Sequence, residues 1–376
     1  MELPSASSDS GARSWWQTFR AWDWTTIAVV LVIKAVLLTY AVQSLVTLGK
    51  DYRGWMDIWN RWDAIHYLRL AQFGYVATGE ERFDLVFFPL YPWSVRAVAL
   101  VVKNFSAAAF LVSGLASIAV GLLLKQLTRL DHSAEVAQNA VWFLFIFPTS
   151  YFLHIAYTEG FFLALSLGCF LAVRKQSWLL AGVLGALACL TRVTGLILLP
   201  ALATEVYLQY RAARRIDFRW LWLGLIPLGF AGYLLLNYQV TGDALAFTNF
   251  QREHWFKQFA APWFGVADVW RRIPGENAME GAHEFFYIAF GFVCCLWCAW
   301  RLRASYTVWM FGSWLLVNST SFVVSVPRYT LTLFPIFILL AQWCTGRRVP
   351  YALVSVFSLL YLALYAGRFA QGYWAF

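Results

Sequence analysis

Residues 59–67 read Trp-Asn-Arg-Trp-Asp-Ala-Ile-His-Tyr, and the segment runs on through Gly74-Tyr75 to Phe87-Phe88-Pro89-Leu90-Tyr91-Pro92. This is the longest interruption of a very apolar chain. Asp63, His66 and Tyr67 fall at i, i+3 and i+4, so on a helix they would share one face. A carboxylate beside an imidazole at a membrane surface suits acid–base chemistry. The alternative is a surface helix that only anchors aromatic rings among lipid headgroups, but tryptophans alone would do that without Asp63.

The composition predicts an integral membrane protein. Hydrophobic residues make up 61% of the 376 residues and charged residues only 13%, whereas a soluble protein carries about 25% charged residues. We therefore expect an all-α polytopic membrane protein. The formal net charge of +9 is explained by basic cytoplasmic loops, so no nucleic-acid partner is expected. The 6 cysteines lie in apolar runs, where buried thiols are a better interpretation than disulfides or metal ligands.

Apolar runs recur along the chain at lengths that suit membrane spans. About eleven spans are expected, near residues 26–45, 106–124, 135–153, 157–173, 177–191, 193–208, 220–238, 284–300, 305–324, 329–344 and 350–367. Two long loops interrupt them, residues 49–104 and 239–283. We expect residues 1–376 to form a single domain, with short interfacial helices in the first loop.

Lysines and arginines cluster at alternate ends of the predicted spans. The clusters on one side are Lys125 and Arg129, Arg174 and Lys175, Arg211 to Arg219, Arg301 and Arg303, and Arg347 and Arg348. The excess of basic residues in cytoplasmic loops places these ends, and the N-terminal segment 1–24, in the cytoplasm. Residues 49–104 and 239–283 then face the outside of the membrane.

Four ionisable residues lie in turns on the predicted outer side. His154 and Glu159 sit between two spans, where an ionisable group is costly and often functional; alternatively, Glu159 only caps the helix that follows. Arg192 and Arg328 lie on a side that is otherwise poor in basic residues. A guanidinium there can bind a phosphate through paired hydrogen bonds. The alternative is an arginine that reaches the lipid headgroups.

The second long loop holds a pair of residues suited to a sugar. Gln251 and Trp255 are four apart, so a short helix would present both on one face. The amide offers hydrogen bonds and the indole offers a stacking surface. An ordinary amphipathic surface helix would account for the same pattern.

In their order and spacing these motifs resemble the PIG-V mannosyltransferase family of integral-membrane GT-C glycosyltransferases. The resemblance is carried by Arg61-Trp62-Asp63, Gly74-Tyr75, Phe87 to Pro92, Tyr157-Thr158-Glu159, Arg192 to Gly195, Gly242 to Phe247 with Gln251 and Trp255, and Pro327-Arg328-Tyr329. It covers most of the chain, and Trp62-Asp63 followed by the Phe-Phe-Pro element is its most distinctive part.

The resemblance implies a GT-C-type bundle and an inverting transfer of a sugar, expected to be mannose, from a polyprenyl- or dolichyl-phosphate donor. The acceptor would be a hydroxyl of a glycolipid or glycan. In this superfamily an acidic residue of the first outer loop acts at the reaction centre, and Asp63 is the residue that matches. From the chemistry of their side chains, we expect Arg192, Arg328 and His66 to bind the donor phosphate. The other expected substrate-binding residues are Arg61, Trp62, Tyr67, His154, Glu159, Gln251 and Trp255.

The resemblance also bears on cofactors and location. At Asp63 the chain lacks the adjacent acidic pair of some GT-C enzymes, so we expect no cofactor and no metal site. Its short loops and compact build are typical of a prokaryotic protein, and we expect a cell membrane with the active site facing outward. A transporter or flippase for lipid-linked sugars is the main alternative; it predicts inverted internal repeats, and no convincing repeat is found. A structural protein whose outer loops bind a partner is the other.

Overall fold

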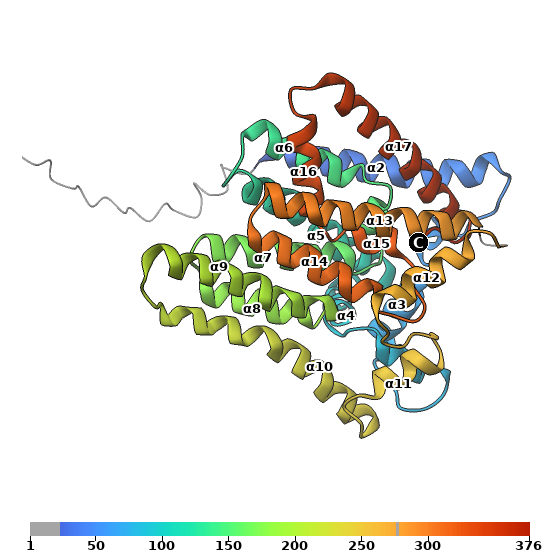
Figure 1. Cartoon of the computed structure of the whole chain (residues 1–376). Coiled ribbons are helices and arrows are strands. Elements are labelled where there is room, and N and C mark those ends of the chain that lie inside the picture. Colours follow the sequence, from blue (N-terminus) through green and yellow to red (C-terminus); the bar gives the residue numbers. More distant parts are fainter. Residues whose placement is uncertain (1–22, 276–277) are drawn as a thin grey trace, which may run out of the picture.

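The computed structural model describes residues 23–275 and 278–376, and nearly all of the N-terminal segment 1–24 lies outside them. Helices make up most of the described chain, and most of the long ones run roughly parallel to one another (Figure 1). The isolated antiparallel bridge between Phe259 and Thr320 is the one β pairing among the described residues. The prediction of an all-α protein is confirmed.

Six helices of the described chain are long and apolar enough to cross a membrane. They are α2 (Trp24–Thr47), α5 (Phe105–Thr128), η4 (Val193–Ile197) continued by α9 (Leu198–Ala213), η5 (Phe218–Leu225) continued by α10 (Ile226–Thr241), α13 (Ala278–Arg301) and α17 (Arg348–Ala370). Shorter helices occupy the other predicted spans: α6 (Ala134–Phe145), α7 (Glu159–Arg174), α8 (Trp178–Cys189), α14 (Ala304–Asn318) and α16 (Pro335–Cys344). The protein is therefore a multi-pass integral membrane protein.

Proline divides the predicted span 329–344 into two helices. α15 (Val326–Thr330) has Pro327 in its first turn, and α16 begins at Pro335. Proline lacks a backbone N–H and therefore begins a helix more readily than it continues one. As a result α15 is a separate short element, which packs beside α13.

The first long loop folds into short helices, as predicted. η1 (Asp57–Trp59), α3 (Asp63–Phe73), η2 (Glu80–Val86) and α4 (Leu90–Val102) follow one another, and η2 and α4 meet at 109°. α3 ends where Gly74 adopts a φ of 83°, a left-handed conformation that costs glycine little. Because α4 packs along both α3 and α5, the loop is fixed to the bundle.

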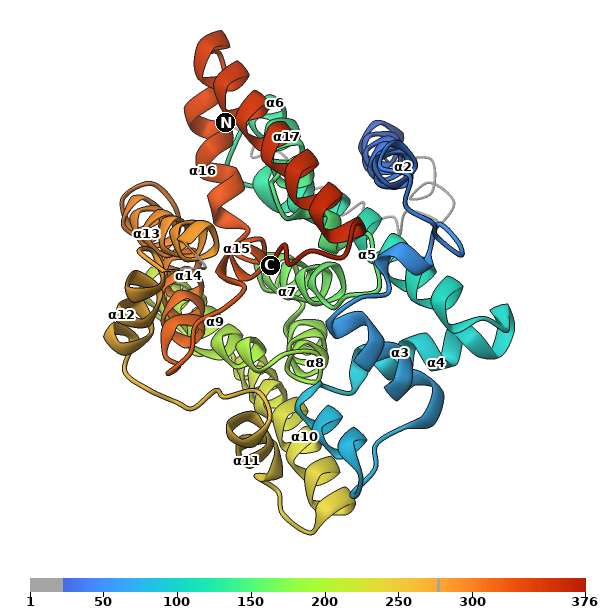
Figure 2. The same cartoon turned by 90° about the vertical axis from the view of Figure 1, so that its right-hand side faces the viewer.

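The second long loop carries α11 (Ala246–Glu253) and α12 (Pro262–Arg272). α11 packs on η2, whereas α12 packs on α13 and α14. Figure 2 views the end of the molecule where α3, α4, α11 and α12 gather, with the connection from α11 to α12 running across it. Both long loops therefore meet at one end of the bundle.

The predicted orientation can be tested with cysteines introduced at Glu80 and Arg215, which are both exposed. The 6 native cysteines are buried and would first be replaced. Because basic loops stay in the cytoplasm, we expect a membrane-impermeant thiol reagent to label residue 80 from outside intact cells and residue 215 only after the cells are opened. Labelling of both positions from the same side of the membrane would contradict the predicted topology, and with it the outward orientation of the first long loop.

Candidate active site

Four charged side chains from four separate segments form one continuous chain of ion pairs. Arg328 on α15 donates from Nη1 to Oδ2 of Asp63 at 2.7 Å, and its Nε lies 3.2 Å from Oε1 of Glu159. Arg192 donates from Nη1 to the same Glu159 oxygen at 2.6 Å. We call these four residues the charge chain. It brings together four of the residues that the sequence singled out.

Both carboxylates of the charge chain stand at the first residue of a helix. Asp63 begins α3 and Glu159 begins α7, where the helix dipole favours a negative charge. Trp62, just before α3, has a φ of 53°, which is uncommon outside glycine and is a kind of strain that clusters at functional sites. Thr158, just before α7, makes no capping bond with its side chain and instead accepts a hydrogen bond from Arg192 at 3.2 Å.

The charge chain is largely shielded from solvent. The side chain of Glu159 is 1% exposed and that of Arg328 is 8% exposed. The Arg328 guanidinium also lies 5.3 to 5.4 Å from the centres of three aromatic rings, those of Phe152, Tyr157 and Tyr329. Such rings attract a cation through their negative faces, so the surroundings keep a buried guanidinium charged.

Two opposing effects set the ionisation of the Asp63–Arg328 pair. Burial raises the pKa of the Asp63 carboxyl, but the adjacent guanidinium, together with the charges of His66 and Lys257, lowers it by more, so the pKa lies below its usual range. Burial lowers the pKa of Arg328, and the carboxylates of Asp63 and Glu159 more than restore it. Asp63 is therefore a carboxylate at neutral pH, paired with a cation.

A second cluster lies one helical turn along α3. The Nδ1 atom of His66 lies 2.7 Å from Oδ1 of Asp84, and Arg69 donates from Nε to Oδ2 of Asp84 at 2.6 Å. The His66 ring stacks on Phe87 at 4.8 Å. Sequence reasoning missed Asp84, whose one signal is an acidic residue inside the apolar run 83–88. Asp84 is buried in η2 and fixes the orientation of the His66 ring.

Tyr67 lies between these two clusters, and Trp255 packs against the second of them. The Tyr67 hydroxyl lies 3.5 Å from Oγ1 of Thr158, beside the charge chain. Trp255, from the second long loop, meets the His66 ring edge-on at 5.3 Å and Phe87 at 5.5 Å. The structure thus brings a residue from each long loop to the same place.

Arg61 and Trp62 precede Asp63 but make different contacts. Arg61 donates to the backbone carbonyls of Ile58 at 3.0 Å and Ala370 at 3.1 Å. Trp62 is 40% exposed and packs edge-on against Trp374. Arg61 therefore ties the first loop to the end of α17, and its side chain lies outside the charge chain.

Among the described residues, no hydrogen bond or ion pair joins His154 or Gln251 to the charge chain. His154 is buried, neither ring nitrogen has a hydrogen-bond partner among the described residues, and burial lowers its pKa to about 3. The ring is therefore neutral at physiological pH. Gln251 lies on α11, where its backbone carbonyl accepts a hydrogen bond from the N–H of Lys257 at 3.0 Å.

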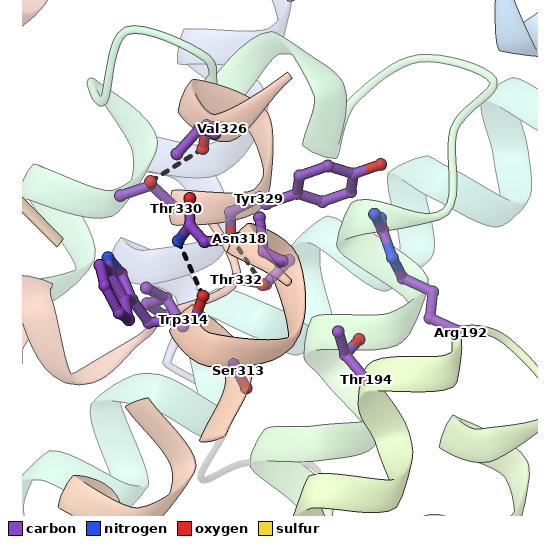
Figure 3. A pocket seen from close by; sticks show the side chains of 11 residues that line it. Arg192, Thr194, Ser313, Trp314, Asn318, Val326, Tyr329, Thr330 and Thr332 are labelled. Carbon is purple, nitrogen blue, oxygen red and sulfur yellow. Dashed lines mark hydrogen bonds between the residues drawn. The ribbon is translucent and has the colours of Figure 1, made fainter. Parts of the chain in front are cut away.

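A small pocket, whose lining mixes apolar and polar side chains, opens beside Arg192 and Tyr329 (Figure 3). Ser313 and Asn318 of α14 line it, together with Thr194. Asn318 donates to the carbonyl of Trp314 at 2.7 Å, while its Oδ1 atom and the Ser313 hydroxyl are buried without a hydrogen-bond partner among the described residues. Buried polar atoms without a partner lower the stability of the fold. These two oxygen atoms can accept a hydrogen bond from a ligand hydroxyl. No motif in the sequence predicts this pocket.

A larger apolar groove of about 630 Å³ lies between α4, α5, α7 and α8. It starts beside Phe161, two residues after Glu159, and continues to Lys175 at the other end of α7. Leucines such as Leu115 and Leu165 line its walls. Within residues 23–275 and 278–376, no group of three or more His, Cys, Asp or Glu residues could hold a metal ion.

No known family model matches the sequence, and no curated protein matches it. Solved structures do match. ArnT from Cupriavidus metallidurans bound to undecaprenyl phosphate has a TM-score of 0.53 and 17% identity, over 89% of this chain and 61% of that one. The Archaeoglobus fulgidus oligosaccharyltransferase tethered with an acceptor peptide has a TM-score of 0.52 and 12% identity, over 96% of this chain and 56% of that one.

A further structure of the archaeal enzyme, oligosaccharyltransferase AglB in complex with an inhibitory peptide and a dolichol-phosphate, has a TM-score of 0.50 and 12% identity, over 95% of this chain and 56% of that one. This chain spans less than two thirds of the length of each of these proteins. At such low identity the likeness concerns the fold. The chain therefore has a polytopic helical fold similar to that of ArnT and of the archaeal oligosaccharyltransferase.

Proposed function

We propose that this protein is a glycosyltransferase that moves a sugar from a polyprenyl-phosphate donor to a hydroxyl of a glycolipid or glycan. The observation that carries the proposal is the charge chain, because it puts a carboxylate base and two guanidiniums in one place at the end of the bundle. The similar fold of ArnT, solved with undecaprenyl phosphate, and of AglB, solved with a dolichol-phosphate, supports a lipid-phosphate donor.

The finer assignments rest on the sequence, through the resemblance, the basic clusters and the short loops. Mannose as the sugar, PIG-V-like membership, a prokaryotic membrane and an outward-facing site belong to this proposal, as does a single catalytic domain over residues 1–376. The tryptophan and tyrosine rings around α3 suit a site at the membrane surface.

Asp63 acts as the general base in this proposal. It takes the proton of the acceptor hydroxyl as that oxygen attacks the anomeric carbon of the donor sugar. The bond from the anomeric carbon to the phosphate oxygen breaks, and the phosphate leaves on its lipid with the electron pair. Attack from the face opposite the phosphate inverts the configuration, so no covalent sugar–enzyme intermediate forms.

Arg192 and Arg328 bind the leaving phosphate. The hydrogen bonds of Arg192 to Glu159 and Thr158 both come from Nη1, and the bond of Arg328 to Asp63 also comes from its Nη1. A guanidinium has five N–H donors, so each arginine can keep its carboxylate and still contact a phosphate. Donors placed where charge develops stabilise the transition state.

We propose that the apolar groove between α4, α5, α7 and α8 holds the donor's polyprenyl chain. The groove begins beside Phe161, in the first turn of the helix that Glu159 starts, and follows the spans, which is the path that we expect an apolar chain to take from the charge chain into the bilayer. Burial of methylene and methyl groups there contributes affinity that needs no hydrogen bonds.

The function is tested with purified protein in liposomes that contain a radiolabelled polyprenyl-phosphate mannose and a crude glycolipid acceptor fraction. Movement of the label from the lipid donor to an acceptor supports the proposal. Movement of intact donor across the bilayer without transfer would support the transporter alternative. A protein that binds neither donor nor acceptor and transfers nothing would fit a structural role.

Substitution of the two arginines should weaken donor binding. Arg192→Lys keeps the positive charge but loses the planar guanidinium and its paired donors. Arg328→Ala loses the charge and the donors. Since hydrogen bonds to charged groups are worth about 1.5–3 kcal/mol, we expect the Kd for the donor to rise about tenfold or more in each variant.

The matched control is Arg82→Lys, because Arg82 lies in the first loop and pairs with Glu253 on the surface. This control should leave the donor Kd unchanged. Unaltered donor affinity in both Arg192→Lys and Arg328→Ala would reduce these arginines to structural partners of the carboxylates.

A further inference from the structure

The connection from α11 to α12 bridges the two halves of the candidate site. At one end Trp255 packs on His66 and Phe87, next to the helix that carries Asp63. At the other end the N–H of Ala260 donates to the carbonyl of Ser319 at 3.1 Å. Residues 255–260, which we call the bridging segment, thus run from the first loop to the chain that leads into α15. Figure 2 shows this connection crossing the end of the bundle.

Lys257 lies in the middle of the bridging segment and is half-buried. Its neighbours Phe256 and Phe259 are 74% and 86% exposed. Burial raises the pKa of Tyr329, but the charges of Lys257, Arg328 and Arg192 lower it by more. The charge of Lys257 also lowers the pKa of Asp63. The bridging segment therefore brings the charge of Lys257 close to the Asp63 and Arg328 end of the charge chain.

The charge chain itself is balanced. Its two carboxylates meet two guanidiniums, and no hydrogen bond or ion pair among the described residues joins Lys257 to a carboxylate. The charge of Lys257 also acts on a third carboxylate, that of Glu284. Glu284 already accepts hydrogen bonds from the backbone N–H groups of Ser325 and Val326, at 2.6 and 2.7 Å. Lys257 thus adds a positive charge that the carboxylates of the charge chain leave uncompensated.

We propose that Lys257 binds the phosphate of the polyprenyl-phosphate donor and neutralises it as it leaves. This inference rests on the proposed function and deepens it. The phosphate carries one negative charge in the donor and gains another when the sugar departs, whereas the arginines are already matched by carboxylates. A compact ammonium on a flexible stem can follow that phosphate, and its attraction grows as the charge develops.

Binding of undecaprenyl phosphate to the full-length protein in lipid nanodiscs tests the proposal. We expect Lys257→Gln to raise the Kd about tenfold or more, and Lys257→Arg to stay close to wild type because the charge is kept. The matched control is Arg252→Gln, which removes an exposed positive charge from α11 in the same loop; it should leave the Kd unchanged.

A second measurement needs no variant. An amine-reactive reagent should modify Lys257 in the free wild-type protein, and bound undecaprenyl phosphate should protect it, as read by mass spectrometry. Unchanged binding by Lys257→Gln, an equal loss in Arg252→Gln, or modification of Lys257 that ignores bound lipid would each overturn the proposal. A wild-type protein that binds no undecaprenyl phosphate would instead overturn the lipid-phosphate donor, so the two failures are distinguishable.

Discussion

Replacement of Asp63 by asparagine is expected to slow sugar transfer about 10²–10⁴-fold, the usual contribution of a general base. The amide keeps the shape of the side chain and an oxygen that can accept the hydrogen bond from Arg328. It cannot take the proton of the acceptor hydroxyl. The loss should therefore appear in kcat, while the Kd for the donor changes little.

The matched control is Asp57→Asn, since Asp57 is an exposed carboxylate of the same loop. It should transfer sugar at the wild-type rate. A folded Asp63→Asn protein that also works at the wild-type rate would rule out Asp63 as the base, and Glu159 would be tested next. If Asp63→Asn unfolds, Asp63→Glu keeps the charge and the pairing with Arg328, and retained transfer by that variant would restore the assignment.

The second large effect concerns stability. Glu159→Gln should lower the free energy of unfolding by about 3–5 kcal/mol, because it removes a buried carboxylate from between two guanidiniums. The amide preserves the size of the side chain, so the loss reports on charge. Thermal unfolding of the purified protein in one detergent, at one pH, measures it.

A double variant separates this electrostatic effect from packing. In the Glu159→Gln background Arg328 keeps its pair with Asp63, so Arg192→Gln removes the cation left unpaired and should recover part of the lost stability. In the wild-type background the same Arg192→Gln change should destabilise. Equal destabilisation by Arg192→Gln in both backgrounds would show that the two side chains are not coupled and would contradict the charge chain.

The sequence predicts single residues of the site better than it predicts their partners. Asp63 stands out because it interrupts an apolar chain in an aromatic setting, and Arg192 and Arg328 because basic residues are scarce on that side. The contact between Asp63 and Arg328 joins residues 265 positions apart. The local periodicity of the sequence cannot predict this contact, because it forms only when α3 and α15 pack against the bundle.

For other residues of the first and second long loops, the sequence motifs did not predict the contacts. Arg61 belongs to the same motif as Asp63, yet its guanidinium holds backbone carbonyls of the first loop and of α17. Asp84 gives a weak signal, since a short 3-10 turn has no extended pattern of apolar residues. Lys257 lies in a connection whose path depends on α11 and α12. The helices themselves were predictable from apolar runs, whereas the hydropathy pattern did not show the division at Pro335, where proline begins a new helix.

The most direct test of the central claim is a structure of the protein with a polyprenyl-phosphate sugar bound. We predict that the phosphate lies within about 3 Å of nitrogen atoms of Arg192, Arg328 or Lys257, and that the anomeric carbon faces Asp63 with its lipid chain in the groove along α5 and α7. A phosphate bound instead at the far end of that groove, beside Lys175, with the charge chain left empty of substrate, would contradict the claim.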